Sequence, residues 1–160
     1  MVRFQPVPAD TPPARDLIAA MVAEMGALYG PIDGTNMPSA TPADFAPPRG
    51  RFLVGFDEES GAPVCCGGVK GLGDGAGEFK RMYVVPTARR RGLARVLLRA
   101  LEDAARDLGY AVARLDTGPL QPHAQALYES AGYRAIGNFN ANPVASYWGE
   151  KRLAPGPADA

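Results

Sequence analysis

The chain has few of the residues that commonly bind metals or form disulfides: one histidine and two cysteines among 160 residues. The cysteines, Cys65 and Cys66, are adjacent, so on a strand their side chains would point to opposite faces. A disulfide between them is therefore not expected, and two such ligands do not make a structural zinc site. We expect both to be small buried strand residues, and we expect no bound metal.

The chain also lacks an excess of charge of either sign, since 17 basic residues balance 17 acidic ones. A general nucleic-acid-binding protein would carry an excess of positive charge. No apolar run approaches the length needed to span a membrane, and the N-terminus has no apolar core of a signal peptide. We therefore expect a cytoplasmic protein with no nucleic-acid or membrane partner.

The length and apolar content of the chain are typical of one folded domain. We expect that domain over residues 1–153, with a disordered tail over residues 154–160. Apolar periodicity predicts helices at about 11–29, 93–108 and 121–131. It predicts strands at 2–7, 51–56, 64–72, 78–85, 110–116, 133–136 and 146–153. The helix between the strands at 78–85 and 110–116 should make those two strands parallel.

A short basic loop, Arg89 to Ala94, connects the strand at 78–85 to a long amphipathic helix. The first N–H groups of a helix have no intrahelical partner, and the macrodipole adds positive character there. Gly92 and Ala94 are small enough to let a phosphate approach the backbone, and arginines favour phosphate. The loop is therefore a candidate anion site, whereas an arginine run alone would only be solvated. The stripe expected to be buried on the helix is Leu93, Val96, Leu97, Ala100, Leu101, Ala104 and Leu108.

Two motifs resemble those of a known family. The strand E-F-K-R-M-Y-V at 78–84, followed by R-x-x-G-x-A at 89–94, resembles the acetyl-CoA-binding motif of the GNAT superfamily of N-acetyltransferases. The run A-Q-A-L-Y-E-S-A-G-Y at 124–133 resembles the next motif of that family. The resemblance implies an α/β fold with a GNAT-like mixed, largely antiparallel sheet. It further implies helices on both faces and a splayed pair of parallel central strands.

The resemblance also implies that acetyl-CoA is the co-substrate. The main chain of Met82 and Val84, with Tyr83 between them, would lie along its acetyl and pantetheine portions, and the Met82 N–H would be an oxyanion donor. Gln121 stands where many members of the family carry Asn. The residues expected around the pyrophosphate are Arg89, Arg90, Arg91, Gly92, Leu93, Ala94 and Arg95.

Tyr128 and Glu78 are the candidate catalytic residues. An alkyl ammonium titrates near ~10.4, so presenting the free amine at pH 7 costs about 4.6 kcal/mol and requires a base. Glu78, at the start of the central strand, is the candidate base, acting through water; the alternative is an exposed turn residue. The family pattern directs Tyr128 at the CoA sulfur as general acid and as a further contact to the cofactor. The alternative for Tyr128 is a core tyrosine on an amphipathic helix.

The acceptor is only weakly marked in the sequence. Lys80 and Arg81 are adjacent on the central strand, so alternation predicts one on each face of the sheet. A cation on the acceptor side would suit an acidic amine; the alternative is an ordinary surface ion pair. The reaction that the resemblance implies is direct transfer of an acetyl group to a primary amine of a small-molecule or peptide acceptor.

Two further points stay open at this stage. The alternative function is a non-catalytic acyl-CoA-binding sensor or regulatory module. A homodimer through the last strand or the loop at 138–145 is also left open.

Overall fold

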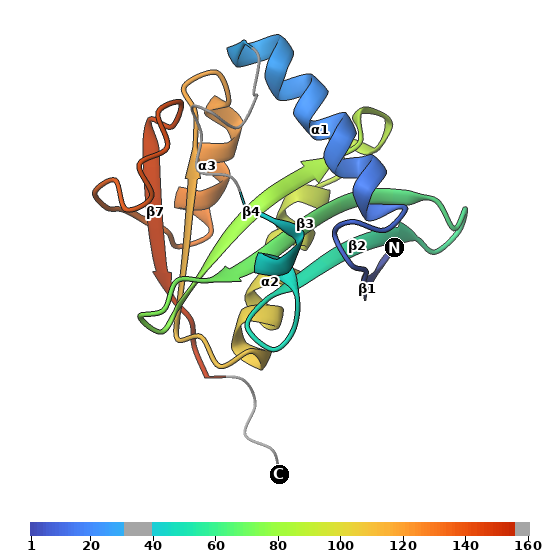
Figure 1. The fold of residues 1–160 in the computed structure, drawn as a ribbon. Helices are drawn as coiled ribbons and strands as arrows, with labels where there is room; N and C mark the ends of the chain where they lie inside the picture. Colours follow the sequence, from blue (N-terminus) through green and yellow to red (C-terminus); the bar gives the residue numbers. More distant parts are fainter. Residues whose placement is uncertain (31–39, 156–160) are drawn as a thin grey trace.

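The computed structural model describes residues 1–30 and 40–155, and one seven-stranded sheet runs through it in the order β1-β2-β3-β4-β5-β7-β6 (Figure 1). The strands are β1 (Val2–Pro6), β2 (Arg51–Asp57), β3 (Pro63–Gly71), β4 (Ala76–Val84), β5 (Val112–Thr117), β6 (Arg134–Ala135) and β7 (Tyr147–Arg152). The α-helices in these residues are α1 (Ala14–Tyr29), α2 (Leu93–Asp107) and α3 (Pro122–Ser130).

Within this sheet only β4 and β5 run parallel to each other. Their ladder joins residues 76–78 to residues 112–114, and both strands then continue for several residues outside that ladder. The two central strands therefore separate beyond Glu78. Helix α1 crosses one face of the sheet, and α2 and α3 cover the other (Figure 1). The expected fold class, including the splayed parallel pair, is confirmed.

The ends of the elements differ from the expected ones by a few residues. Helix α1 begins at Ala14, after Pro13, whereas the pattern predicted a start near residue 11. Strand β6 has two residues, where four were expected. The tail expected at 154–160 falls mostly outside the described residues. None of the helices within residues 1–30 and 40–155 has the length and apolar character to cross a membrane.

Two hydrophobic cores lie on opposite faces of the sheet, and the adjacent cysteines of β3 divide between them. Cys65 packs in the core under α2 and α3, and Cys66 in the core under α1. Both are fully buried and neither forms a disulfide, as expected. Burial raises the pKa of Cys65 to about 11 and that of Cys66 to about 12. Neither thiol is therefore available as a nucleophile near neutral pH.

The buried face of α2 is rotated relative to the expected stripe. Leu97, Leu101 and Ala104 are buried as predicted, but Val96 is 40% exposed, so that assignment was wrong. The neighbouring Leu98 and Ala105 are buried in its place. Glu102, a charged residue outside the expected stripe, is also buried on this face. Its carboxylate accepts hydrogen bonds from Tyr133 Oη at 2.9 Å and Lys151 Nζ at 3.0 Å. Those two partners, from beyond α3 and from β7, satisfy the carboxylate, so the helix can bury it.

Strand β4 is interrupted at Arg81. This residue has a φ of 62°, in the left-handed region, and the register with β3 shifts between Cys66 and Gly68. The left-handed conformation costs a residue with a Cβ roughly 1–2 kcal/mol. Because the bulge inserts an extra residue, strict alternation fails here. The prediction that Lys80 and Arg81 lie on opposite faces was wrong. The flanking residues Phe79 and Met82 both pack in the core under α2 and α3, which leaves Lys80 and Arg81 together on the face of α1.

Candidate active site

Two cavities adjoin where β4 and β5 separate. The larger, of about 460 Å³, lies between β4, the start of α2, and α3. The smaller, of about 160 Å³, lies between α1, the middle of β4 and the end of β5. Met25, Met82, Gln121 and Tyr128 line both. The junction thus holds Met82 and Tyr128, two residues that the motifs single out. The two cavities are called the larger and the smaller cavity below.

The larger cavity gathers most of the residues expected to hold the cofactor. Those in its lining are Met82, Tyr83, Val84, Arg89, Arg90, Gly92, Leu93, Ala94, Gln121 and Tyr128. Two expected residues, Arg91 and Arg95, are not in that lining. The Arg95 guanidinium instead donates to Ser130 Oγ at 2.6 Å, which ties α2 to the end of α3. The side chains of Arg91 and Arg95 therefore contribute no wall to this cavity.

Helix α2 presents its N-terminus to the larger cavity. Gly92 is its N-cap, with a φ of 73° in the left-handed region. A Cβ at this position would meet nothing within 4 Å, so the space before the helix is open. The N–H groups of Leu93 and Ala94 fall in the first turn, where no intrahelical acceptor exists. Open space, first-turn N–H groups and the positive end of the helix dipole are the features that favour an anion at a helix N-terminus.

Arg89 connects the basic loop at 89–94 to α1 and β4. Its Nη2 donates to both carboxylate oxygens of Glu24 on α1, at 2.8 and 2.7 Å, and its Nε donates to the Val84 carbonyl at 3.0 Å. The hydrogen bond that Arg89 donates to Glu24 raises the pKa of Arg89. The guanidinium also lies 5.7 Å from the centre of the Tyr83 ring. Arg89 thus joins α1, β4 and the loop, which fixes the loop at the cavity mouth.

Tyr128 comes from α3, which turns it towards β4. Its hydroxyl donates to Met82 Sδ at 3.6 Å, and its side chain is buried. Burial, followed by the charge of Asp116, raises the pKa of Tyr128 well above its usual range. The phenol therefore stays protonated at neutral pH, and it lies at the point where the two cavities meet.

Gln121 lies at the N-cap of α3 and lines both cavities. Its Oε1 accepts from Tyr29 Oη at 3.3 Å and from Thr117 Oγ1 at 3.5 Å. The Tyr29 hydroxyl also accepts from the Leu120 N–H at 3.1 Å. The end of α1 is thereby connected to the loop that leads into α3. These contacts orient the Gln121 side chain between the cavities.

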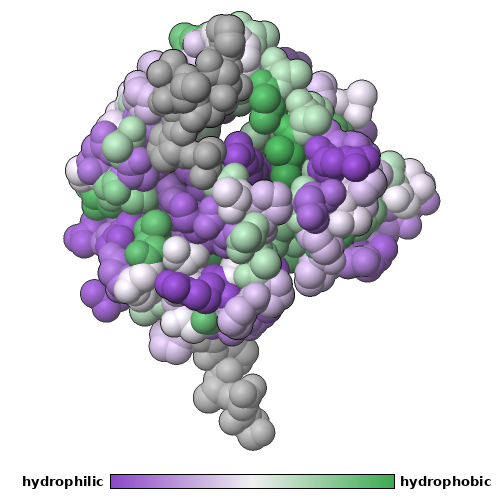
Figure 2. All heavy atoms as spheres, viewed as in Figure 1, coloured by the Kyte–Doolittle hydropathy of each residue, from purple (hydrophilic) through white to green (hydrophobic). Residues whose placement is uncertain are grey.

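The smaller cavity is lined by charged groups of both signs. Lys80 and Arg81 of β4 stand in its wall together with Asp116 of β5. In space-filling view, hydrophilic and hydrophobic residues are intermixed on the face of the molecule seen in Figure 1 (Figure 2). The apolar part of the wall includes Met21 and Met25 of α1 together with Phe79, Met82 and Val144. Such a wall suits a small polar molecule with an aliphatic part.

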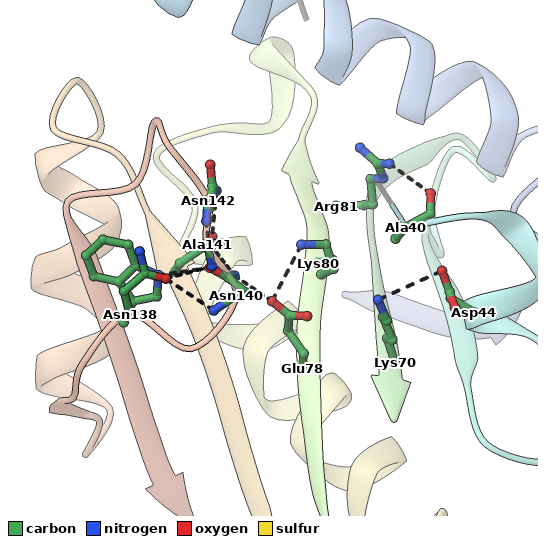
Figure 3. A network of polar contacts seen from close by, with 12 residues as sticks. Ala40, Asp44, Lys70, Glu78, Lys80, Arg81, Asn138, Asn140, Ala141 and Asn142 are labelled. Carbon is green, nitrogen blue, oxygen red and sulfur yellow. Dashed lines mark hydrogen bonds and ion pairs between the residues drawn. The ribbon is translucent and has the colours of Figure 1, made fainter. Parts of the chain in front are cut away.

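Glu78 lies beside this cavity rather than in its lining, and it is only 3% exposed. Its Oε2 accepts from Asn140 Nδ2 at 2.8 Å and is 3.5 Å from Lys80 Nζ (Figure 3). Asn140 also donates to Asp116, and its Oδ1 accepts from Trp148 Nε1 at 3.0 Å. Asn140 therefore bridges the two carboxylates at the point where β4 and β5 part. The reading of Glu78 as an exposed turn residue was wrong.

Several lining residues gave no signal in the sequence. Helix α1 contributes Glu24, Met25 and Leu28 to the larger cavity, whereas apolar periodicity predicts only a helix there. Asp116 is predicted only as the end of a strand. The single histidine, His123, also lines the larger cavity, and no motif marks it. These positions become part of a site only through tertiary packing, which no local pattern encodes.

Comparison with known proteins identifies the arrangement. Residues 19–133 match the model of the Acetyltransferase (GNAT) family. The chain belongs to this family. An IAA acetyltransferase of Azospirillum brasilense is 36% identical over 132 residues, which cover 79% of this chain and 83% of that protein. The GNAT chain described here is thus an enzyme of the N-acetyltransferase class, and enzymes of this family generally use acyl-CoA.

Solved GNAT-type structures share the fold along nearly the whole chain. An acyl-CoA N-acyltransferase of Klebsiella pneumoniae, so named provisionally, is 30% identical with a TM-score of 0.76, covering 96% of this chain and 99% of that one. A GNAT acetyltransferase of Staphylococcus aureus Mu50 is 15% identical with a TM-score of 0.78, covering 96% of this chain and 100% of that one. The second similarity concerns the fold alone.

The anion site predicts a sharp effect of charge at Gly92. Replacement Gly92→Asp should weaken acetyl-CoA binding by at least about 100-fold, because like charges about 4 Å apart near a protein surface repel by roughly 4 kcal/mol. Isothermal titration calorimetry with acetyl-CoA measures the change, starting from an expected micromolar affinity of about −8 kcal/mol.

Gly61→Asp is the matched control for the Gly92 variant. Gly61 has a φ of 76°, a Cβ there would also meet nothing within 4 Å, and it lies outside both cavities. It therefore imposes the same backbone strain without a charge at α2. Equal weakening by both variants, or none by Gly92→Asp, would place the cofactor elsewhere.

Proposed function

We propose that this enzyme transfers an acetyl group from acetyl-CoA directly to the primary amine of a small acceptor. The observation that carries the proposal is the junction of the two cavities at Met82 and Tyr128. The larger cavity opens at the anion site of α2, and the smaller is lined by polar groups. A cofactor in the first and an amine in the second would meet at the junction.

The proposed cofactor path follows from the positions of the lining groups. The pyrophosphate lies at the first turn of α2, near Gly92, and the pantetheine arm lies along β4 from Val84 to Met82. The thioester then reaches Tyr128, whose hydroxyl is 3.6 Å from Met82 Sδ. The bulge at Arg81 interrupts the ladder with β3 next to Met82, which supports the Met82 N–H as a donor to the carbonyl oxygen.

In the proposed reaction, the amine nitrogen attacks the thioester carbonyl carbon and forms a tetrahedral intermediate. The C–S bond then breaks, and the departing thiolate takes the proton of Tyr128. The proton of the attacking amine passes to a carboxylate, which releases it to solvent, and solvent returns a proton to the phenolate. No acyl-enzyme is needed, which agrees with the burial of both cysteines.

Glu78 is the proposed base, reached through water, and Asp116 is a second candidate. Glu78 occupies the last position of β4 that pairs with β5, at the point where these two strands separate. Asp116 lines the smaller cavity directly and accepts hydrogen bonds from two asparagines, one of them Asn142 at 3.1 Å. Both carboxylates contact Asn140, so either could receive a proton near the amine.

The general-acid proposal predicts that Tyr128→Phe lowers kcat by about 100-fold or more while acetyl-CoA affinity changes little. Release of free CoA thiol measures kcat, and calorimetry measures affinity. Because burial keeps the Tyr128 pKa above its usual value, native activity should show no falling limb up to about pH 10.

Tyr147→Phe is the control for this variant. Its hydroxyl is buried and has no hydrogen-bond partner in the described part of the chain, and it lies outside both linings. Its removal should leave kcat unchanged and should not lower stability, because no hydrogen bond is lost. Unchanged turnover in Tyr128→Phe would contradict the acid role. Binding of acetyl-CoA with no turnover on any amine would favour a sensor module over an enzyme.

The base proposal predicts different pH profiles for two conservative variants. Glu78→Gln should lower kcat/KM by about 100-fold at neutral pH and should remove the rise of kcat/KM with pH. Asp116→Asn should keep that rise. The measurement is initial rate against pH, with the same amine throughout. The opposite pattern would assign the base to Asp116, and intact limbs in both variants would exclude both carboxylates.

A further inference from the structure

The two cations in the wall of the smaller cavity differ in whether a carboxylate lies beside them. Its wall carries two cations, Lys80 and Arg81, and one anion, Asp116. The Lys80 ammonium is 3.5 Å from the Glu78 carboxylate, and its side chain is only 14% exposed. That cation is therefore already neutralised by its neighbour on the same strand, which leaves Arg81 as the cation facing the cavity.

Arg81 has no such counter-ion in the part of the chain that the structure describes. Its Nη2 donates to the backbone carbonyl of Ala40 at 3.1 Å, and no carboxylate of residues 1–30 or 40–155 lies within 4 Å of its guanidinium. Burial lowers the pKa of Arg81, which is the signature of a charge that would gain from a partner. A half-buried charge without a counter-ion favours binding of an anion.

The backbone holds Arg81 in this position at a cost. Its φ of 62° belongs to a conformation that glycine adopts freely and arginine does not. Its carbonyl accepts a contact from Cys66 Sγ at 3.5 Å, which keeps the bulge against β3. A strained residue whose side chain lines a cavity points to a role for that side chain.

Asp116 places a negative charge in the same cavity wall, opposite in sign to Arg81. It lies on β5, and Arg81 on β4, beyond the point where these strands cease to pair. The two charges therefore stand in the walls of one cavity on separate strands. Lys70, by contrast, pairs with Asp44 at 4.0 Å and is outside the cavity lining (Figure 3). A small molecule with an ammonium and an anionic group matches the charges of Asp116 and Arg81.

We propose that the acceptor is a primary amine that also carries a carboxylate, and that Arg81 binds this carboxylate while the amine faces Asp116 and the thioester. A guanidinium offers two parallel N–H donors that fit a carboxylate. The inference rests on the proposed acetyl transfer and adds the class of acceptor. Arg81 acts in it as a specificity-determining residue.

The test compares paired acceptors. Each of the common amino acids is assayed against its carboxamide, with spermidine as a cationic amine, by release of CoA thiol. The native enzyme should use the best carboxylate about 10- to 100-fold more efficiently in kcat/KM than its amide. In Arg81→Gln this ratio should fall close to one, mainly through a higher KM for the carboxylate.

Lys70→Gln removes a positive charge from the same face of the sheet outside the cavity, so it should preserve the ratio. Preference for spermidine or for carboxamides, or an unchanged ratio in Arg81→Gln, would overturn the inference. A preference for a phosphorylated amine over the carboxylates would also overturn it, because the anion would then be a phosphate.

A binding measurement separates this inference from the proposed function. N-acetyl amino acids and their amides are titrated calorimetrically into the native protein and Arg81→Gln, without acetyl-CoA. Tighter binding of the carboxylate, lost in Arg81→Gln, supports the anion site whatever the turnover. Equal binding of both forms overturns it. Failure to bind acetyl-CoA in a separate titration would instead contradict the proposed function.

Discussion

The separation of β4 and β5 is the constraint on which the rest of the molecule depends. The two strands share a ladder only from Ala76 to Glu78 on β4. Beyond it, the backbone groups of both strands are no longer used between them, and side chains from α1 and α3 close the space from either side. A sheet that stayed paired would leave no junction between the two cavities. The polar bridge through Asn140 lies at the point of separation and holds both strands beside it.

The site also requires that α1 and α2 keep their positions beside the space between β4 and β5. Helix α2 is held by its buried face and by the contacts of Glu102 with Tyr133 and Lys151. Helix α1 is held to the basic loop by the Glu24–Arg89 pair. Exposed ion pairs contribute only about 0–1 kcal/mol to stability. The Glu24–Arg89 pair therefore matters more for the position of the loop than for the stability of the fold.

Much of this arrangement could be predicted from local pattern. The order of strands and helices, the parallel pair and the loop at Gly92 follow from periodicity and motif, because each is encoded by neighbours in the chain. The predictions that were wrong concern side-chain positions that are set by contacts between residues far apart in the chain. Val96 was assigned to the core in place of Leu98, since a helical stripe read from sequence leaves its rotation uncertain. Lys80 and Arg81 were assigned to opposite faces of the sheet, because alternation does not foresee a bulge.

The site was predictable to a similar degree. The strand and loop residues that line the larger cavity came from a motif, whereas Glu24 and Leu28 come from a helix far away in sequence. Arg95 directly follows the motif, yet its side chain contacts Ser130. The acceptor side carries no motif, and its charges become informative only when Arg81 and Asp116 are found in one cavity.

A crystal structure of the protein with acetyl-CoA tests the central claim most directly. The account predicts the pyrophosphate on the N–H groups that follow Gly92, with the thioester sulfur within hydrogen-bonding distance of Tyr128 Oη. The acetyl group should then face the smaller cavity. A cofactor that avoids the opening between β4 and β5, or a thioester turned away from Tyr128, would contradict the account.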